Sequence, residues 1–195
     1  QGRVGGEFVS LGPAMRGWMN EGRSYIPPVA LGEVRRAGTA GKVIKSNNPG
    51  FAPGDYVAGW GGVQDYVVVE GKDITKVDPR LAPLPVFLGT LGMPGMTAYF
   101  GLLEVGKPEE GETVVVSGAA GAVGTVVGQI AKITGCRVIG IAGGPDKCRW
   151  IVDEPGFDAA TAYQSADVNK ELRPHCPNAV PLHFAHPGGP LPAPP

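Results

Sequence analysis

The clearest hydrophobic pattern of the chain is a set of short apolar runs between Glu112 and Tyr163. Glu112–Ser117 contains the run Thr-Val-Val-Val, and Arg137–Ala142 is a second run of the same kind. Continuous apolar runs of this length are typical of strands that are buried on both faces of a parallel sheet. Asp158–Tyr163 has the composition of a third strand. The pattern therefore predicts three strands in this part of the chain.

Two amphipathic segments separate these runs. Val123, Val127, Ile130 and Ile133 recur at helical spacing, and Gly135 follows them as a helix stop. Pro145 occupies the favoured first-turn position of a second helix. The order strand–helix–strand–helix–strand predicts parallel strands joined by right-handed crossovers, which is part of a Rossmann fold. Three strands alone would leave an unpaired sheet edge.

The first part of the chain has a different texture, with short strands and many turns. Gly41–Lys45 and Asp65–Glu70 are rich in β-branched residues. Turn signals follow at Asn48–Gly50, Ala52–Asp55 and Gly59–Gly62. We expect a small, strongly bent β-barrel-like domain here.

Between the two patterns, Thr90–Gly101 carries apolar residues at helical spacing, interrupted by Pro94 and Gly95. We interpret this as a turn that leads into a helix, and Gly106–Glu112 as a linker. The predicted fold class is α/β. Its predicted parts are a β-rich domain (1–85), a connecting turn and helix (86–111), a partial parallel βαβαβ nucleotide-binding domain (112–189) and a Pro-rich tail (190–195), which we expect to be disordered or truncated.

Composition removes several function classes. The 17 Lys and Arg residues nearly balance the 18 Asp and Glu residues, so nothing indicates a nucleic-acid or anionic membrane partner. No apolar run approaches the length of a membrane span, and the first ten residues lack a secretory pattern. The absence of an initiator Met suggests missing upstream residues.

Cysteine and histidine content argues against metal chemistry. The three cysteines, Cys136, Cys148 and Cys176, have no paired spacing, which is typical of reduced thiols in a cytoplasmic protein. All three histidines lie after residue 174. We therefore predict no metal site. The three tryptophans, Trp18, Trp60 and Trp150, are interpreted as packing residues.

Candidate chemistry is concentrated in the turn Ser117–Gly124. Gly121 and Gly124 occupy the second and third glycine positions of the dinucleotide-binding fingerprint, and Ala119 stands at the first. A pyrophosphate can bind at a helix N-terminus, where free N–H groups and the helix dipole stabilise its charge. Because the turn lies between a predicted strand and a helix, Gly121, Ala122, Val123 and Gly124 are candidate cofactor-binding residues. A tight turn without a ligand remains the alternative.

The end of the second strand indicates which cofactor. NAD sites usually carry an acid there that accepts from the ribose 2′-hydroxyl. Here the position reads Ala142-Gly-Gly144, and Lys147 can supply positive charge to a phosphate. Asp146 argues the other way, although it lies beyond the usual position. We predict NADP(H), with Tyr163 either against the adenosine or at the edge of the core.

Three segments carry a resemblance to a known family. They are Leu91–Leu103 (LGMPGMTAYFGLL), Val116–Gly124 (VSGAAGAVG) and Gly143–Cys148 (GGPDKC). They resemble the zinc-independent medium-chain dehydrogenase/reductases, in the branch of prostaglandin reductases and alkenal or enone double-bond reductases. Pro13–Gly17, Ser24–Glu33 and Gln64–Tyr66 resemble the GroES-like catalytic domain of that family.

The resemblance implies a homodimeric enzyme that uses NADPH to reduce the carbon–carbon double bond of α,β-unsaturated aldehydes and ketones. It implies that Gly121–Gly124 cradle the pyrophosphate and that Lys147 and Tyr163 hold the 2′-phosphate. It places Thr97 near the nicotinamide. No catalytic residue can be assigned.

The chain departs from the family in several places. Ala14 stands where the family usually has a substrate-site Tyr, and His186 stands in place of a cofactor-contacting Asn. The second half of the nucleotide domain is expected to be absent. Two alternatives therefore stay open: a quinone reductase of the same superfamily, or a truncated, non-catalytic product that binds nucleotide.

Overall fold

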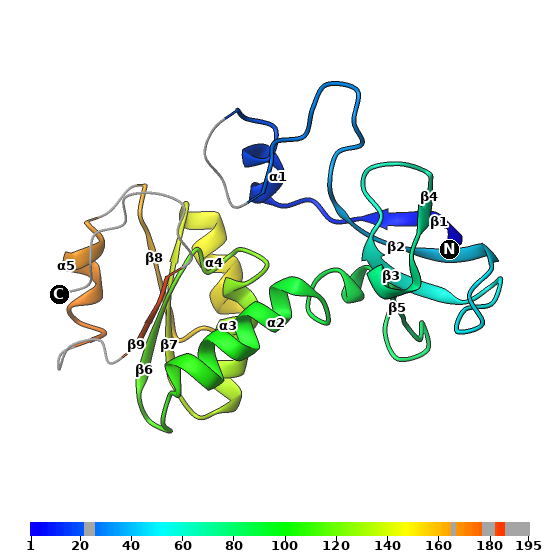
Figure 1. Ribbon diagram of the computed structural model, residues 1–195. Coiled ribbons are helices and arrows are strands. Elements are labelled where there is room, and N and C mark those ends of the chain that lie inside the picture. Colours follow the sequence, from blue (N-terminus) through cyan, green and yellow to red (C-terminus); the bar gives the residue numbers. More distant parts are fainter. Residues whose placement is uncertain (22–25, 165–166, 177–181, 186–195) are drawn as a thin grey trace. The chain divides into compact units, whose positions relative to one another are not determined.

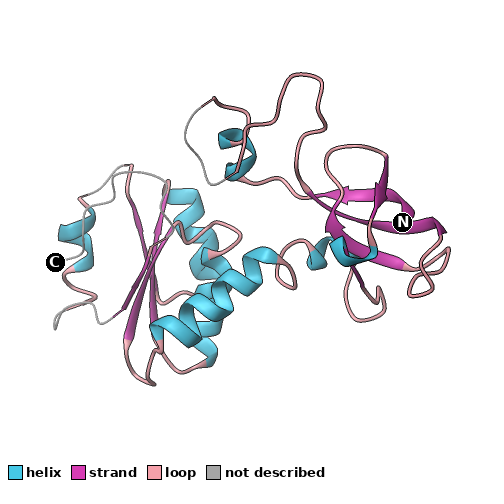
Figure 2. Cartoon of the chain, in the orientation of Figure 1, coloured by secondary structure: helices cyan, strands magenta, loops and turns pink. Residues whose placement is uncertain are grey.

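The computed structural model describes residues 1–21, 26–164, 167–176 and 182–185. Within it the chain divides into two units, Gln1–Gly92 and Met93–Pro195. The predicted tail and His186 lie outside the described residues. Figures 1 and 2 show that strands of the first unit and those of the second form separate sheets.

The first unit is built on a five-stranded antiparallel sheet. Its strands are β1 (Gly2–Val9), β2 (Gly38–Ser46), β3 (Tyr56–Trp60), β4 (Tyr66–Val69) and β5 (Ile74–Lys76), in the order β4-β1-β2-β3-β5. The predicted strands at 41–45 and 65–70 correspond to β2 and β4. The short helices are α1 (Pro13–Gly17), η1 (Gly71–Asp73) and η2 (Leu84–Phe87).

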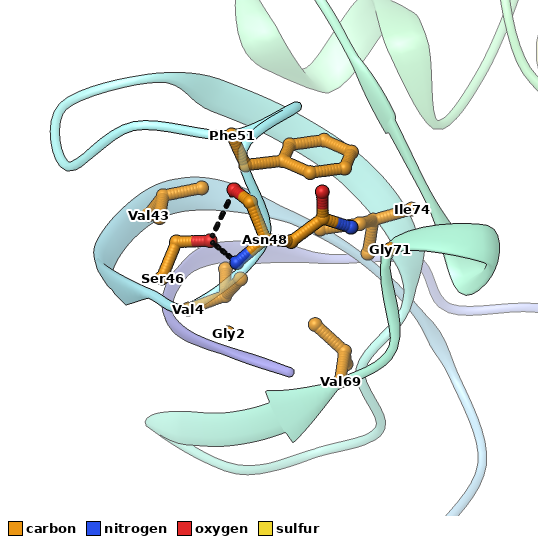
Figure 3. A pocket seen from close by; sticks show the side chains of 9 residues that line it. All are labelled: Gly2, Val4, Val43, Ser46, Asn48, Phe51, Val69, Gly71 and Ile74. Carbon is orange, nitrogen blue, oxygen red and sulfur yellow. Dashed lines mark hydrogen bonds between the residues drawn. The ribbon is translucent and has the colours of Figure 1, made fainter.

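Valine side chains pack closely on the inner face of this sheet and leave almost no free volume there. Val4, Val43, Val57 and Val69 form its buried cluster. A cavity of about 10 Å³ beside them is lined by these strands and by Asn48 and Phe51; Figure 3 shows Ser46 and Asn48 bonded to each other at its rim. A space of that volume holds at most one water molecule, so it is a packing feature and not a substrate site.

The second unit contains a parallel sheet in the order β8-β7-β6-β9. Its strands are β6 (Thr113–Ser117), β7 (Arg137–Ala142), β8 (Ala159–Ala162) and β9 (Leu182–Phe184). The first three lie where the hydrophobic runs predict them. The expectation of three strands is wrong, because β9 pairs with β6 on the side away from β7. Three residues between segments of irregular composition are too short to produce a periodic signal.

Helices cover both faces of the parallel sheet (Figure 1). One face carries α2 (Met93–Tyr99), the π-helix η3 (Phe100–Gly106), α3 (Gly124–Ile133) and α4 (Pro145–Asp153), whose buried side chains join those of Val114, Val116 and Val138. The other face carries α5 (Val168–Leu172), which packs on Val115, Ile139 and Ile141. Alternate residues of β6 thus enter two cores, which explains its unbroken apolar run.

One helix side chain lies differently from the sequence prediction, and two tryptophans are less buried than core residues. The helical spacing predicts Ile133 on the same face as Val127, but Ile133 is 84% exposed. The buried face of α3 is instead formed by Val127 and Ala131 with two glycines, and Ile133 is rotated away from it. Trp60 and Trp150 are about half exposed, whereas Trp18 is buried; Trp60 still packs edge-to-face against Trp18, as predicted of a packing residue. Within the described ranges, no helix is both long and apolar enough to span a membrane.

Candidate nucleotide-binding site

The glycine-rich turn lies between β6 and α3, at the carboxyl end of the parallel sheet. Gly118 begins it with a φ of +61°, a conformation that favours glycine. Gly124 follows at the start of α3, where a β-carbon would lie 2.4 Å from the carbonyl oxygen of Gly118. Gly124 is therefore required for the close approach of helix and strand. Ala119, at the position of the fingerprint's first glycine, is fully buried and donates its N–H to Ile141.

The same turn presents backbone donors that have no partner within the described part of the chain. Gly121 donates to Gly118 at 2.8 Å, which closes the turn, and Thr125 donates to Gly121. The N–H groups of Ala122, Val123 and Gly124 have no acceptor among the described residues. Orphan N–H groups at the start of a ten-residue helix favour an anion. A β-carbon on Gly121 would meet only the Gly118 carbonyl, at 3.1 Å, so glycine here leaves its outer side open.

The end of β7 forms the second part of the site. Gly143 and Gly144 connect β7 to α4, and Tyr163 follows β8 and donates its N–H to Ala142. The Tyr163 hydroxyl lies 3.6 Å from the place where a β-carbon of Gly143 would stand. The tyrosine is about half exposed. Its ring therefore borders the surface of the two-glycine turn.

Charged side chains occupy the first turns of α4. Lys147 is exposed and makes no ion pair with any described residue. Asp146, the acid that argued for NAD, forms an ion pair with Arg149 one turn further along the helix. Its charge is thus engaged on the helix surface. The end of β7 has two glycines and a free lysine, which fits a phosphate better than a hydroxyl.

The structure brings most of the predicted residues to one edge of the sheet. Because β6, β7 and β8 are parallel, the glycine turn, the Lys147 helix start and Tyr163 all follow carboxyl ends of neighbouring strands. Thr97 is separate: it lies on α2, which packs against α3, and its hydroxyl donates to the carbonyl of Met93 at 2.8 Å. Its neighbour Ala98 belongs to the same buried cluster as Ala119, whereas Thr97 itself makes no hydrogen bond to a described residue of the glycine turn. The residues at the edge could hold a dinucleotide with a 2′-phosphate.

Ser117 and His183 form a polar pair in this sheet that the sequence patterns do not predict. Ser117 is fully buried at the end of β6, and its Oγ lies 2.6 Å from Nε2 of His183 on β9. Burial lowers the pKa of His183 from its usual value, which favours the neutral ring. Only the pairing of β9 with β6 brings the two residues together, so no local signal could have found them.

The remaining polar side chains of the described residues lack the arrangement that a metal ion needs. Among residues 1–21, 26–164, 167–176 and 182–185, no three His, Cys, Asp or Glu side chains are placed to hold a metal ion. Cys136 and Cys176 are buried, and burial raises the pKa of the Cys148 thiol. Arg16, in the Pro13–Gly17 segment that resembles the GroES-like domain, hydrogen-bonds to Asn20.

Known proteins are similar to this chain over both of its units. Residues 1–77 match a family described as the N-terminal domain of oxidoreductases. The chain is 44% identical over 182 residues to the NADPH-dependent curcumin reductase of Escherichia coli, covering 93% of this chain and 53% of that protein. It is 39% identical over 186 residues to a 2-alkenal reductase (NADP(+)-dependent) of Nicotiana tabacum, covering 93% and 54%.

A solved structure extends the similarity to the fold. CurA from Vibrio vulnificus, crystallised in complex with NADPH, is 42% identical, with a TM-score of 0.90 over 97% of this chain and 56% of that one. The chain thus spans about half the length of the relatives it matches. The predicted class, a β-rich domain followed by a partial Rossmann domain, is confirmed. The comparisons thus confirm the resemblance to the zinc-independent medium-chain dehydrogenase/reductases: over about half of their length, the chain is similar to curcumin, alkenal and prostaglandin reductases.

Proposed function

We propose that this chain supplies the NADPH-binding edge of a reductase that acts on the carbon–carbon double bond of α,β-unsaturated ketones and aldehydes. One observation carries the proposal. The unpaired N–H groups of residues 122–124 follow β6, and the acid-free turn Gly143–Gly144 follows the neighbouring strand β7, so both lie at the same edge of the sheet. Two relatives, an NADPH-dependent curcumin reductase and an NADP(+)-dependent alkenal reductase, support the same cofactor and substrate class.

Each predicted residue has a role in this proposal. Gly121, Ala122, Val123 and Gly124 bind the pyrophosphate through backbone N–H groups. Lys147 supplies a charge and Tyr163 a hydroxyl donor to the 2′-phosphate. Bound NADPH would supply a hydride for the β-carbon of the conjugated substrate, and solvent or a hydroxyl a proton for the α-carbon. Thr97 is proposed to lie beside the nicotinamide, where its hydroxyl can still accept a hydrogen bond while it donates to Met93.

Ligand-dependent melting of the purified chain tests cofactor binding. NADPH at about 100 times its Kd should stabilise the native state by about 2.7 kcal/mol and raise Tm by about 5–10 °C. NADH at the same concentration should raise Tm less. Absence of a shift at millimolar NADPH would contradict the proposal.

A lysine variant tests the 2′-phosphate contact. Lys147→Gln should weaken NADPH binding by about tenfold to a hundredfold, because a charge-assisted contact is lost, and should leave NADH binding nearly unchanged. Lys170→Gln is the matched control, since Lys170 is an exposed lysine of the same unit on α5. Equal losses in the two variants would mean that Lys147 contributes only general charge.

Oxidation of NADPH followed with a simple enone and, separately, with a benzoquinone distinguishes the reaction classes. Turnover of the enone supports the proposal, and turnover of the quinone alone supports a quinone reductase. Binding of NADPH without either turnover supports a non-catalytic nucleotide-binding product. We further propose a homodimer, by resemblance to the family, which light scattering of the purified chain can check.

A further inference from the structure

The strongest unused feature of the described residues is the side chain of Gln164, which lies across the two-glycine turn after β7. The place where a β-carbon of Gly143 would stand is 3.7 Å from Nε2 of Gln164, and the corresponding place at Gly144 is 3.7 Å from its Oε1. The carboxamide therefore spans both glycines at ordinary van der Waals distance. Neither glycine has a positive φ, so backbone conformation alone does not demand glycine there.

This position matters because of what nucleotide-binding sheets usually place at the end of their second strand. In NAD sites, an acidic residue at the end of this strand accepts a hydrogen bond from the ribose 2′-hydroxyl. In this chain the two residues that follow β7, Gly143 and Gly144, have no side chain. The space next to it is bordered by the hydroxyl of Tyr163 and the carboxamide of Gln164, both from the turn after β8.

The carboxamide is also available. Gln164 is exposed, and its side chain makes no hydrogen bond to another described residue. A carboxamide offers two N–H donors where a carboxylate offers only acceptors. A neutral donor suits a phosphate oxygen, whereas a carboxylate at the same place would repel it.

We infer that Gln164 is a specificity-determining residue that distinguishes a 2′-phosphate from a 2′-hydroxyl. The inference rests on the proposed function, since it assumes that the adenosine end of the cofactor lies at this edge. Gln164 is then a third group at the 2′-phosphate, beside Lys147 and Tyr163, and it is neutral. It donates a hydrogen bond at the place where NAD sites carry an acid. Discrimination between NADPH and NADH then depends on one side-chain atom: an amide nitrogen donates a hydrogen bond, whereas a carboxylate oxygen only accepts one.

The isosteric variant Gln164→Glu tests this directly. Its affinities for NADPH and NADH are measured by calorimetry beside those of the unaltered chain. We expect NADPH to bind about tenfold to a hundredfold more weakly, because a charge-assisted donor is replaced by a like charge, and NADH to bind as well as before or better. Gln164→Ala should lose less NADPH affinity than Gln164→Glu, since it removes the donor without adding a charge.

The control is Gln129→Glu, the same change at an exposed glutamine in the body of α3, where the side chain bonds only to the carbonyl of Thr125. It should leave the NADPH-to-NADH ratio unchanged. One outcome is that the unaltered chain prefers NADPH while Gln164→Glu keeps the same NADPH-to-NADH ratio or binds both cofactors equally more weakly. That result would contradict the inference about Gln164 and leave the proposed function standing. If the unaltered chain binds neither cofactor, the proposed function itself fails, and the inference falls with it.

Discussion

Gly124 and Gly121 belong to the same turn, yet a methyl group at each would meet different surroundings. At Gly124 a β-carbon would lie 2.4 Å from the Gly118 carbonyl oxygen and 2.8 Å from Cα of Ala119, both backbone atoms that cannot move aside. At Gly121 it would meet one oxygen at 3.1 Å. One glycine thus serves folding, while the other leaves space on the outside of the turn.

Substitution by alanine should separate the two roles. Gly124→Ala should destabilise the chain by about 1–3 kcal/mol through overpacking, which exceeds the gain of about 1 kcal/mol in helix propensity. Gly121→Ala should cost less, about 1 kcal/mol or under, because its single contact needs a shift of only a few tenths of an ångström, but it should weaken NADPH binding. Urea denaturation and calorimetry measure the two effects. Equal stability losses would contradict this division.

The pair Ser117 and His183 predicts a pH dependence. Since burial lowers the pKa of His183 in the folded chain, the unfolded chain binds more protons than the folded chain as pH falls below the ordinary histidine pKa of 6.5. Stability contributed by the neutral ring should be complete above that pH and be lost as pH falls through the folded pKa. The free energy of unfolding, measured from pH 8 to pH 5, should therefore decrease. His183→Phe should reduce this dependence; an unchanged slope would assign it to other groups.

At the scale of elements, contact between α3 and the sheet depends on a glycine in the middle of the helix. A β-carbon on Gly128 would lie 2.1 Å from the ring of Phe157, which is 2% exposed and also contacts the Gly140 position of β7. The ring is wedged between helix and strand. This contact explains why α3 keeps a helix-weakening residue on its buried face.

A double-mutant cycle tests this packing. Gly128→Ala should destabilise the chain by about 1–3 kcal/mol despite the better helix propensity of alanine. Combined with Phe157→Leu, which shortens the opposing side chain, the substitution should cost less than it does alone. Urea denaturation of the two single variants and the double variant supplies the cycle. Strict additivity would show that α3 does not rest on Phe157.

At the scale of the whole molecule, the two sheets predict a pattern of amide protection. In the parallel sheet β6 and β7 are central, whereas β8 and β9 each pair on one side among the described residues. Hydrogen exchange should be slowest in Val115, Val116 and Ile139, and faster in β8 and β9, since edge strands open at lower free energy. In the antiparallel sheet β1, β2 and β3 should exchange more slowly than β4 and β5. Protection of β9 equal to that of β6 would indicate a further partner on its outer edge.

Local pattern and spacing determined much of this protein. The unbroken apolar runs located β6 and β7, because a strand buried on both faces must be apolar at every position. The glycines at 121 and 124 marked the turn, because turn geometry restricts residue type locally. The acid-free stretch at Ala142–Gly144 indicated the cofactor, a prediction that the NADPH-dependent relatives support.

Tertiary structure alone decided the rest. Three-residue β9, the Ser117–His183 bond and the position of Gln164 over Gly143 and Gly144 all join segments that are distant in sequence or separated by a turn. Ile133 fits the helical period of its segment, yet the sheet contacts only the face that includes Val127 and Ala131. Periodicity shows that a segment has an apolar side, but which side is buried depends on what packs against it. The sequence thus determines the elements and the turn between them, while pairing across the sheet decides which polar groups meet at its edge.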